Sequence, residues 1–169
     1  FGTLKGARFN GELFLKNIFK YSPLVIILKK NSKTKISYEI HKNIIVIKTE
    51  NVKKLVLEIA SIIYENSLKE IVAVTGTNGK TSVCDYTRQL WTLKNIKSAS
   101  IGTLGIILKN KKIEDLDLTT PDSCEIQSIL YLLSKNNCEK AIIEASSIGL
   151  DQERLKPLKF NKVVFTNLT

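Results

Sequence analysis

The residues best suited to chemistry follow an apolar run that ends at Thr75, and they are Gly76, Thr77, Asn78, Gly79, Lys80, Thr81 and Ser82. A strand that runs into a glycine-bearing turn and then a helix is the setting of a phosphate-binding loop. Glycines let backbone N–H groups approach phosphate oxygens, and a helix N-terminus adds about half a positive charge. Lys80 would then neutralise β- and γ-phosphates as the catalytic residue, and the Thr81 hydroxyl would hold Mg²⁺. The alternative is a strand-turn-helix junction that uses glycine only for its turn.

A carboxylate stands at the end of a second apolar strand. Lys140-Ala-Ile-Ile-Glu144 is followed directly by polar residues. In parallel sheets, ligands bind at the carboxyl ends of strands. Glu144 is therefore placed to bind Mg²⁺ directly or through water. The alternative is a surface carboxylate at a strand end, which needs no ligand.

A threonine pair precedes the segment that should form a later helix. Thr119 and Thr120 come directly before Pro121, which suits the first turn of a helix. Their hydroxyls either cap that helix or bind a ligand.

A further polar cluster follows the strand that ends near Glu144. It combines the Ser146 hydroxyl, the Gln152 amide and the guanidinium of Arg154. An arginine among such groups suits a carboxylate or a phosphate on a substrate. By itself, an arginine on the surface would need no such role.

The elements that must position these residues alternate along the chain from Ile71 onward. Short apolar strands are separated by longer helical patterns, which is typical of βαβ units and a parallel sheet. The expected strands are 71–75, 98–102, 141–145 and 163–165, and the expected helices are 81–93 and 122–133. The strand at 163–165 is expected to be buried. The fold class is therefore α/β.

The residues before Asn66 show a different pattern. A helix is expected over 11–21, and the continuous apolar runs 24–28 and 44–47 indicate strands buried on both faces. Asn51 is expected to cap a helix with an apolar stripe that reaches Ile63. We therefore expect a small α/β domain over residues 1–67 and a nucleotide-binding domain over residues 68–169.

Composition narrows the class of partner. The chain has 169 residues, of which 43% are hydrophobic and 25% charged, so it is globular rather than disordered or fibrous. Its net charge of +10 invites a nucleic-acid partner, but nearly all the cations are dispersed lysines, whereas base readout favours arginine. A polyanionic small molecule is the better-supported partner, and we expect no nucleic acid. No apolar run approaches the roughly 20 residues of a membrane span, so we expect no membrane partner.

The cysteines and the single histidine suggest no further site. Cys84, Cys124 and Cys138 are far apart and lack metal-ligand spacing, so neither disulfides nor zinc are expected, and a reducing cytosol fits. Cys84 lies early in the expected helix 81–93, where a thiol can be nucleophilic, but packing is favoured because no histidine base follows it. His41 has no second histidine with which to share a metal.

Together these motifs resemble the Mur ligase family. Ala73 to Thr81 is similar to the family's shortened phosphate loop, which lacks the first glycine of the full pattern and so accounts for Val74. The segments Thr119-Thr120-Pro121, Glu144 to Arg154 and Phe165 to Thr169 follow in the order and spacing of its MurE branch, the UDP-N-acetylmuramoyl-tripeptide synthetases. Leu4 to Phe14 resembles a stretch of the N-terminal UDP-binding domain that usually reads Lys-Gly, a spacer, then Asp-Gly-His. Asn10 and Glu12 replace that Asp and His.

The resemblance implies an ATP-dependent amide-bond ligase of peptidoglycan precursor synthesis, a monomer in the bacterial cytoplasm. Its substrates would be UDP-N-acetylmuramoyl-L-alanyl-D-glutamate and a diamino acid, meso-diaminopimelate or L-lysine, joined through an acyl phosphate. ATP and Mg²⁺ are implied, with Thr81 and Glu144 as metal ligands. The residues that would contact the UDP-muramoyl dipeptide are Thr119, Thr120, Ser146, Gln152 and Arg154, and those that would bind the phosphates are Gly76, Thr77, Asn78, Gly79, Lys80, Thr81 and Ser82.

The family pattern also implies that the chain is a fragment. Further sequence is expected before Phe1 and after Thr169, including a second metal site, the adenine contacts and the domain that selects the amino acid. The two domains would then both be partial, and these residues alone would be catalytically silent. The competing hypothesis, motivated by the net charge, is a non-catalytic phosphate-loop or nucleic-acid-binding module.

Overall fold

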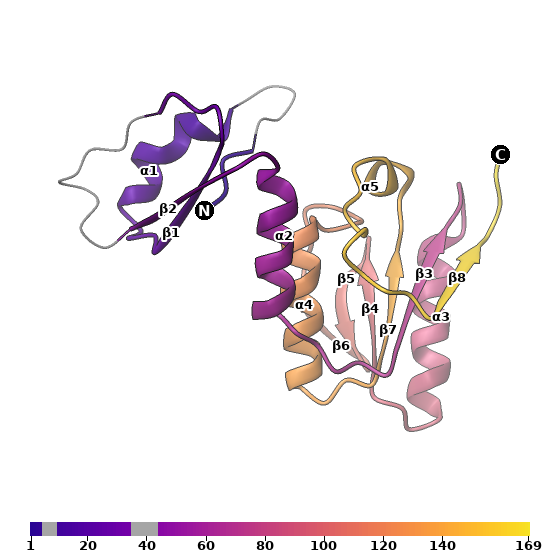
Figure 1. The fold of residues 1–169 in the computed structure, drawn as a ribbon. Coiled ribbons are helices and arrows are strands. Elements are labelled where there is room, and N and C mark those ends of the chain that lie inside the picture. Colours follow the sequence, from indigo (N-terminus) through magenta and orange to yellow (C-terminus); the bar gives the residue numbers. More distant parts are fainter. Residues whose placement is uncertain (5–9, 35–43) are drawn as a thin grey trace. The chain divides into compact units, whose positions relative to one another are not determined.

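The computed structural model of the protein describes residues 1–4, 10–34 and 44–169 (Figure 1). They form two compact units, Phe1–Ile59 and Ala60–Thr169. His41 and residues 5–9 of the segment that resembles a UDP-binding domain lie outside the described residues. The assignment of residues 1–67 and 68–169 to two domains stays a prediction. Among the described residues, no helix combines the length and apolar character that a membrane crossing requires.

The first unit is built on two parallel strands. Its elements are the 3-10 helix η1 (Gly11–Phe14), α1 (Leu15–Phe19), β1 (Val25–Lys29), β2 (Ile45–Thr49) and the start of α2 (Val52–Ile63). β1 and β2 pair in parallel, and Leu15, Ile26 and Leu28 form the core beside them. The side chain of Asn51 accepts the Lys54 N–H at 2.9 Å, so its predicted capping role is confirmed.

The prediction that both strands of this unit are buried on both faces is wrong for β2. Ile26, Ile27 and Leu28 of β1 are buried, whereas Ile45 of β2 is 62% exposed. In the described part of the chain β2 pairs with β1 alone, so it lacks a neighbouring strand on its other edge. Continuous apolar sequence was therefore a poor guide to burial at this strand.

The second unit holds a six-stranded sheet. Its elements are β3 (Glu70–Thr75), α3 (Lys80–Leu93), β4 (Ser98–Gly102), β5 (Gly105–Leu108), β6 (Lys111–Glu114), α4 (Ser123–Lys135), β7 (Lys140–Glu144), α5 (Ser147–Asp151) and β8 (Lys162–Phe165). The strand order is β6-β5-β4-β7-β3-β8. The four strands from β4 to β8 in that order are parallel, β5 is antiparallel to β4, and β6 is antiparallel to β5. The expected α/β fold with a mainly parallel sheet is confirmed.

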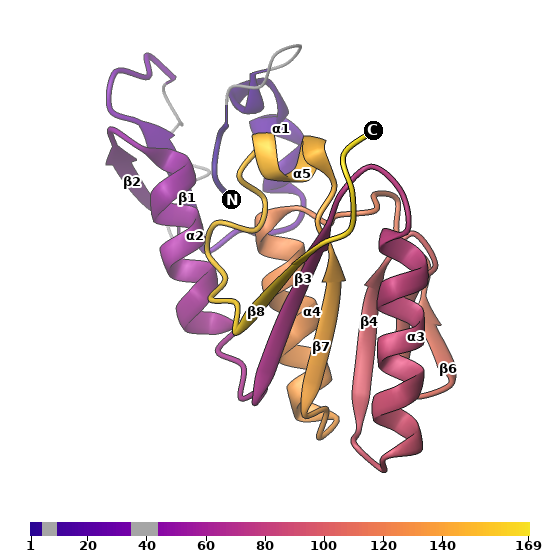
Figure 2. The same ribbon diagram turned by 90° about the vertical axis from the view of Figure 1, so that its right-hand side faces the viewer.

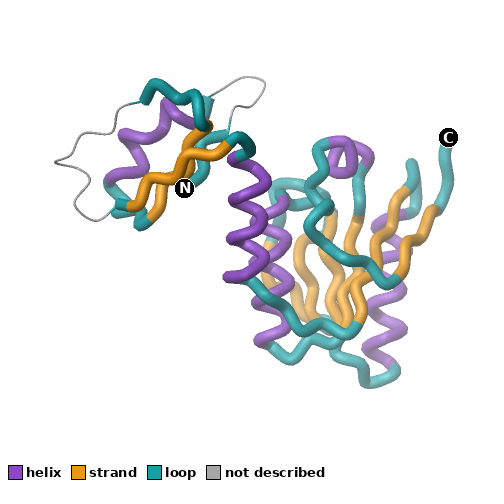
Figure 3. The backbone as a smooth tube through the Cα atoms, in the orientation of Figure 1, coloured by secondary structure: helices purple, strands orange, loops and turns teal. Residues whose placement is uncertain are grey.

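Helices α3 and α4 cover opposite faces of this sheet (Figures 2 and 3). The side chains of β3 alternate between them, as a strand buried on both faces requires. Ile71 and Ala73 join the core on the α4 side, while Val72 and Val74 pack with Cys84 of α3. This double burial fixes the orientation of β3 and of the loop that follows it.

Three local expectations need correction. The hairpin β5–β6 was not predicted, because its polar, lysine-rich sequence is typical of a loop. Strand β8 is not buried, since it lies at the sheet edge and Val163 is 65% exposed. Helix α4 begins at Ser123, one residue after the expected start at residue 122, so Pro121 lies before its first turn; the Asp122 carboxylate caps the helix and forms a capping box with Glu125.

A cluster of charges joins the amino ends of three parallel strands. Glu70 of β3 accepts hydrogen bonds from Lys140 of β7 at 2.5 Å and from Lys162 of β8 at 2.7 Å. The Glu70 side chain is only 13% exposed, so its carboxylate is partly shielded from water. These hydrogen bonds, first that of Lys140 and then that of Lys162, lower the pKa of the Glu70 carboxyl.

We predict that Glu70→Gln destabilises the protein near pH 7 and that the deficit shrinks towards about pH 3. A carboxyl whose pKa is lowered in the folded state stabilises above its unfolded pKa and loses that contribution as the pH falls through its folded pKa. Thermal unfolding at both pH values measures the effect. Glu139→Gln, which breaks an exposed pair with Lys69, is the control and should cost less. An equal deficit for Glu70→Gln at both pH values would contradict the prediction.

Candidate functional site

The predicted phosphate loop lies at the carboxyl end of β3. Gly76 and Gly79 have φ values of 133° and 84°, in the region that favours glycine. A Cβ on Gly76 would lie 2.1 Å from Thr166 Oγ1, so a side chain does not fit there. Gly79 precedes the first residue of α3, whose first-turn N–H groups have no intrahelical carbonyl partner. These free donors and the helix dipole make the loop suited to an anion.

The Lys80 side chain folds back over this loop. Its Nζ donates hydrogen bonds to the Gly76 carbonyl at 2.7 Å and to the Thr77 carbonyl at 3.0 Å. The ammonium is thus held beside the N-terminus of α3, where its charge adds to the helix dipole. The expected role of Lys80 in neutralising phosphate stays a prediction.

The Glu144 carboxylate is buried beside the loop, with 2% of the residue exposed. Its Oε2 accepts the Thr81 hydroxyl at 2.9 Å, and its Oε1 accepts the Thr103 N–H at 2.9 Å. The alternative of a surface carboxylate is therefore wrong. Among residues 1–4, 10–34 and 44–169, no lysine or arginine forms an ion pair with Glu144, so neutral donors alone surround it. A buried carboxylate in such surroundings is suited to a cation.

Thr103 is a site residue that the sequence did not reveal. Besides its N–H, its hydroxyl donates to Glu144 Oε2 at 3.2 Å. Thr103 lies in the tight turn between β4 and β5, and β4 lies next to β7 in the sheet. Only the hairpin and the strand order bring it to Glu144, and neither was predicted. The preceding glycine is needed too, since a Cβ on Gly102 would lie 2.2 Å from Glu144 Oε1.

The threonine pair joins this centre but does not cap α4. The Thr119 hydroxyl lies 3.3 Å from the Thr103 hydroxyl, which continues the chain of hydroxyls away from Glu144. Thr120 is fully buried, and its hydroxyl donates to the Glu144 carbonyl at 2.9 Å and accepts the Ser146 N–H at 2.9 Å. Thr120 thus ties the loop before α4 to the end of β7.

Ser146, Gln152 and Arg154 are brought together with Thr120. The Ser146 hydroxyl caps the short helix α5 and lies 2.9 Å from the Thr120 hydroxyl. Arg154 Nη1 donates to the Thr120 carbonyl at 2.7 Å, and its Nε and Nη2 both donate to Gln152 Oε1. All predicted residues of this cluster therefore lie at the carboxyl ends of the parallel strands, as the phosphate loop does.

The structure favours a packing role for Cys84. It is 2% exposed and packs against Val72 and Val74. Burial, followed by the nearby negative charge of Glu144, strongly raises the pKa of its thiol. A thiol that stays protonated is a poor nucleophile.

In the described residues, no group of three or more His, Cys, Asp or Glu side chains could hold a metal ion. The oxygen ligands at hand for a cation in this site are the Thr81 hydroxyl and the Glu144 carboxylate. Hard cations such as Mg²⁺ use few protein oxygens when phosphates supply the others.

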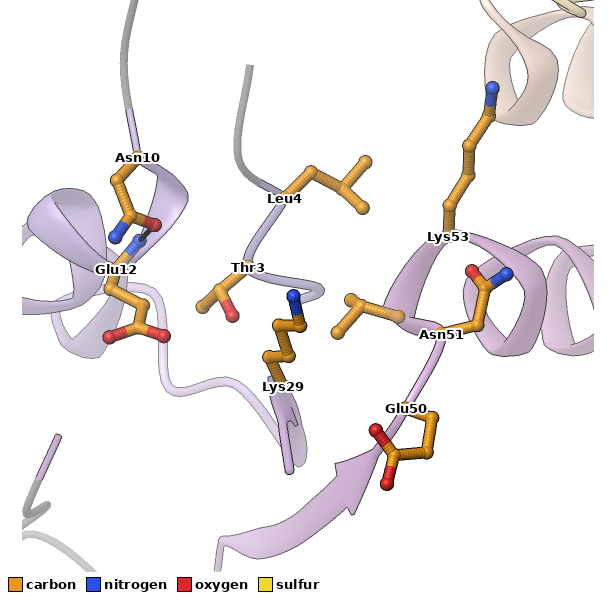
Figure 4. Close-up of a pocket in the computed structure, with 9 residues that line it drawn as sticks. Thr3, Leu4, Asn10, Glu12, Lys29, Glu50, Asn51 and Lys53 are labelled. Atoms are coloured by element: carbon orange, nitrogen blue, oxygen red, sulfur yellow. Dashed lines mark hydrogen bonds between the residues drawn. The ribbon is translucent and has the colours of Figure 1, made fainter. Parts of the chain in front are cut away.

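The first unit contains a separate open cavity of about 250 Å³ (Figure 4). Residues that line it include Asn10, Glu12, Lys29, Glu50 and Lys53. The Asn10 side chain accepts the Glu12 N–H at 3.2 Å, and the Glu12 carboxylate accepts the Thr34 hydroxyl. Both residues that depart from the family pattern thus line this cavity.

Comparison with known proteins gives a family match over most of the second unit. Residues 74–169 match the model of the Mur ligase middle domain. A solved structure of a UDP-N-acetylmuramoyl-L-alanyl-D-glutamate–2,6-diaminopimelate ligase superposes with a TM-score of 0.61 at 24% identity, covering 86% of this chain and 34% of that one. At that identity the likeness shows the fold alone.

Curated relatives with the same ligase name match along the whole chain. Those of Rickettsia conorii and Zymomonas mobilis are 35% and 37% identical, and a second ligase of that name from Clostridium acetobutylicum is 33% identical. Each alignment covers 100% of this chain but only 34%, 33% and 35% of the respective relative. The chain therefore spans about a third of the length of these relatives.

We predict that Gly102→Ala destabilises the protein by about 1–3 kcal/mol, because its Cβ collides with the Glu144 carboxylate. In the Glu144→Ala background the collision partner is absent, so the same substitution should cost much less. Denaturant unfolding of the four proteins of this double-mutant cycle measures the coupling. Equal costs in the two backgrounds would show that Glu144 does not occupy this position.

Proposed function

This chain belongs to the Mur ligase family, and on that premise we propose that it is part of an ATP-dependent ligase that adds a diamino acid to UDP-N-acetylmuramoyl-L-alanyl-D-glutamate. The names of its curated relatives contain 2,6-diaminopimelate, so we propose that amino acid rather than L-lysine. The observation that carries the proposal is the meeting of the Thr81 hydroxyl with the buried Glu144 carboxylate at 2.9 Å beside the phosphate loop. Residues 1–67 would then belong to the UDP-binding domain and residues 68–169 to the ATP-binding domain.

The proposed reaction makes an amide in two steps. A carboxylate oxygen of the UDP-linked substrate attacks the γ-phosphorus of ATP, the bond from that phosphorus to the bridging oxygen breaks, and ADP leaves. The amino group of the diamino acid then attacks the acyl carbon of the acyl phosphate, phosphate leaves and the nitrogen loses a proton. Activation is needed because a free carboxylate is a poor electrophile.

The chain's own residues would act mainly by positioning and by neutralising charge. Of the phosphate-binding set, Lys80, Thr81 and Ser82 would hold the triphosphate at the N-terminus of α3. Gly76, Thr77, Asn78 and Gly79 would shape the loop that leads to them, since the Thr77 and Asn78 N–H groups are bonded to Asn167. The Lys80 ammonium would exchange its bonds to the loop carbonyls for phosphate oxygens. A charge that is already in position when the reaction starts stabilises the transition state without any rearrangement of the protein.

The residues fit a magnesium ion held between protein and nucleotide. Glu144 is buried among neutral donors and lies in contact with the Thr81 hydroxyl, so both can supply oxygen ligands. When bound, Mg²⁺ supplies charge that neutralises the phosphate oxygens. Thr103 would keep the Glu144 carboxylate in place through its N–H and its hydroxyl.

The polar cluster next to this centre would hold the UDP-muramoyl dipeptide. The Thr119 hydroxyl contacts the Thr103 hydroxyl, which donates to Glu144, so a substrate at Thr119 would be close to the nucleotide phosphates. Ser146, Gln152 and Arg154 would contact the same substrate. Thr120 would act by tying Arg154 and Ser146 together, because its own hydroxyl and carbonyl are already bonded to the protein.

We further propose that the enzyme is a monomer of the bacterial cytoplasm that serves peptidoglycan synthesis, and through it cell shape and division. The precursor and ATP are both cytoplasmic metabolites. The excess of lysine is compatible with two polyanionic substrates, a nucleoside triphosphate and a UDP-sugar.

The test is phosphate release by the protein in its native full length. It should require ATP, UDP-N-acetylmuramoyl-L-alanyl-D-glutamate and diaminopimelate together, and omission of any one should abolish it. Turnover with folate and glutamate would point to another branch of the family. Salt-dependent RNA binding without affinity for ATP would favour the nucleic-acid module instead.

We predict that Lys80→Ala lowers kcat by at least about 100-fold, because it removes the ammonium expected to neutralise phosphate. Affinity for the UDP-linked substrate should stay close to that of the wild type, since the Lys80 ammonium donates its hydrogen bonds to the phosphate loop. Steady-state kinetics and equilibrium binding measure the two quantities. Lys94→Ala, an exposed lysine at the other end of α3, is the matched control. Similar turnover by the Lys80 and Lys94 variants would contradict the assignment.

A further inference from the structure

The segment after β8 lies against the phosphate loop, although about 90 residues separate them in sequence. Thr166 Oγ1 donates to the Asn78 carbonyl at 2.7 Å. The Thr169 N–H donates to the Thr77 hydroxyl at 3.2 Å. The close approach also explains Gly76, since any side chain there would collide with Thr166 and with the backbone of Asn167.

Asn167 makes the most contacts with the loop. Its backbone carbonyl accepts the Thr77 N–H at 2.9 Å, and its side-chain Oδ1 accepts the Asn78 N–H at 3.0 Å. Its Nδ2 donates to the Asn78 carbonyl at 3.3 Å. One residue therefore uses its main chain and both ends of its amide to hold two consecutive peptides of the loop.

This contact decides which N–H groups are available to an anion. Those of Thr77 and Asn78 point to Asn167 and are already bonded. Those of Lys80, Thr81 and Ser82 belong to the first turn of α3 and have no intrahelical partner. The loop thus has an inner half bound to the segment after β8 and an outer half open to phosphate.

We propose that Asn167 is a positioning residue for the nucleotide, which holds the Thr77–Asn78 half of the loop so that the first turn of α3 and Lys80 receive the phosphates. The inference rests on the proposed ATP binding of this site and adds a residue to it. Asparagine suits the position because its side chain has one acceptor for the Asn78 N–H and one donor for the Asn78 carbonyl. Aspartate would keep the acceptor, lose the donor and add a negative charge near the phosphates.

The experiment measures equilibrium binding of MgATP and of the UDP-linked substrate, separately, to the native full-length protein and its variants. Asn167→Ala should bind MgATP about tenfold more weakly, because two side-chain hydrogen bonds that order the loop are lost. Asn167→Asp should bind it more weakly still, and its deficit should shrink as salt is added. Affinity for the UDP-linked substrate should change by less than about twofold in both variants, which is a small change in binding free energy.

The matched control is Asn161→Ala. Asn161 Oδ1 accepts the Ile71 N–H at 2.7 Å, so this variant also loses a bond between the β8 region and the β3 region, but at the opposite end of the sheet. It should lower the melting temperature while leaving MgATP affinity unchanged. Equal MgATP affinity in Asn167→Ala and wild type, or an equal loss in Asn161→Ala, would overturn the inference while leaving the proposed function intact. Absence of MgATP binding by the wild type would overturn both.

Discussion

The site depends on one buried carboxylate. Glu144 ends a strand in the middle of the sheet, is almost fully shielded from water, and is surrounded in the described structure by neutral donors. Burying a charge without a cation is costly, so the groups around Glu144 must be placed where they can donate hydrogen bonds to its carboxylate. Strand β4 brings Thr103, the phosphate-loop helix α3 brings Thr81, and Gly102 leaves room for the carboxylate itself. The order of β4, β7 and β3 in the sheet places Thr103 and the phosphate loop on either side of Glu144.

The two proposed binding regions meet through this centre. On one side, the Thr81 hydroxyl links Glu144 to the loop that would hold the triphosphate. On the other, the Thr103 hydroxyl contacts the Thr119 hydroxyl, and the next residue, Thr120, accepts a hydrogen bond from Arg154 at its carbonyl. A ligase must bring a carboxylate and a γ-phosphate into contact, and holding both from one rigid sheet edge lowers the entropic cost of doing so. The short spacing of these groups therefore suits phosphoryl transfer between two bound substrates.

Sequence reasoning found the parts of this site that rest on local pattern. The glycine turn, Lys80, Thr81 and the end of β7 follow from strand and helix periodicity together with turn chemistry. Thr103 and the contacts of Asn167 could not be found this way, because they depend on which strands are neighbours and on a hairpin with polar sequence. Burial was misjudged at β2 and β8 for a related reason, since apolar runs do not say whether a second layer covers them. Asp122 took the capping role that the sequence left open for Thr119 and Thr120, because its carboxylate reaches the first-turn N–H groups of α4.

Glu144 and Thr81 are proposed to hold a divalent cation together with the nucleotide. Titration of Mn²⁺, as a paramagnetic substitute for Mg²⁺, into the nucleotide-bound protein under electron paramagnetic resonance tests this proposal most directly. Glu144→Gln keeps the shape of the side chain and removes its charge, so Mn²⁺ should bind about tenfold more weakly or worse than in the wild type, while Glu139→Gln should bind it normally. Equal Mn²⁺ affinity in the wild type and Glu144→Gln would contradict the proposed role of Glu144 as a metal ligand.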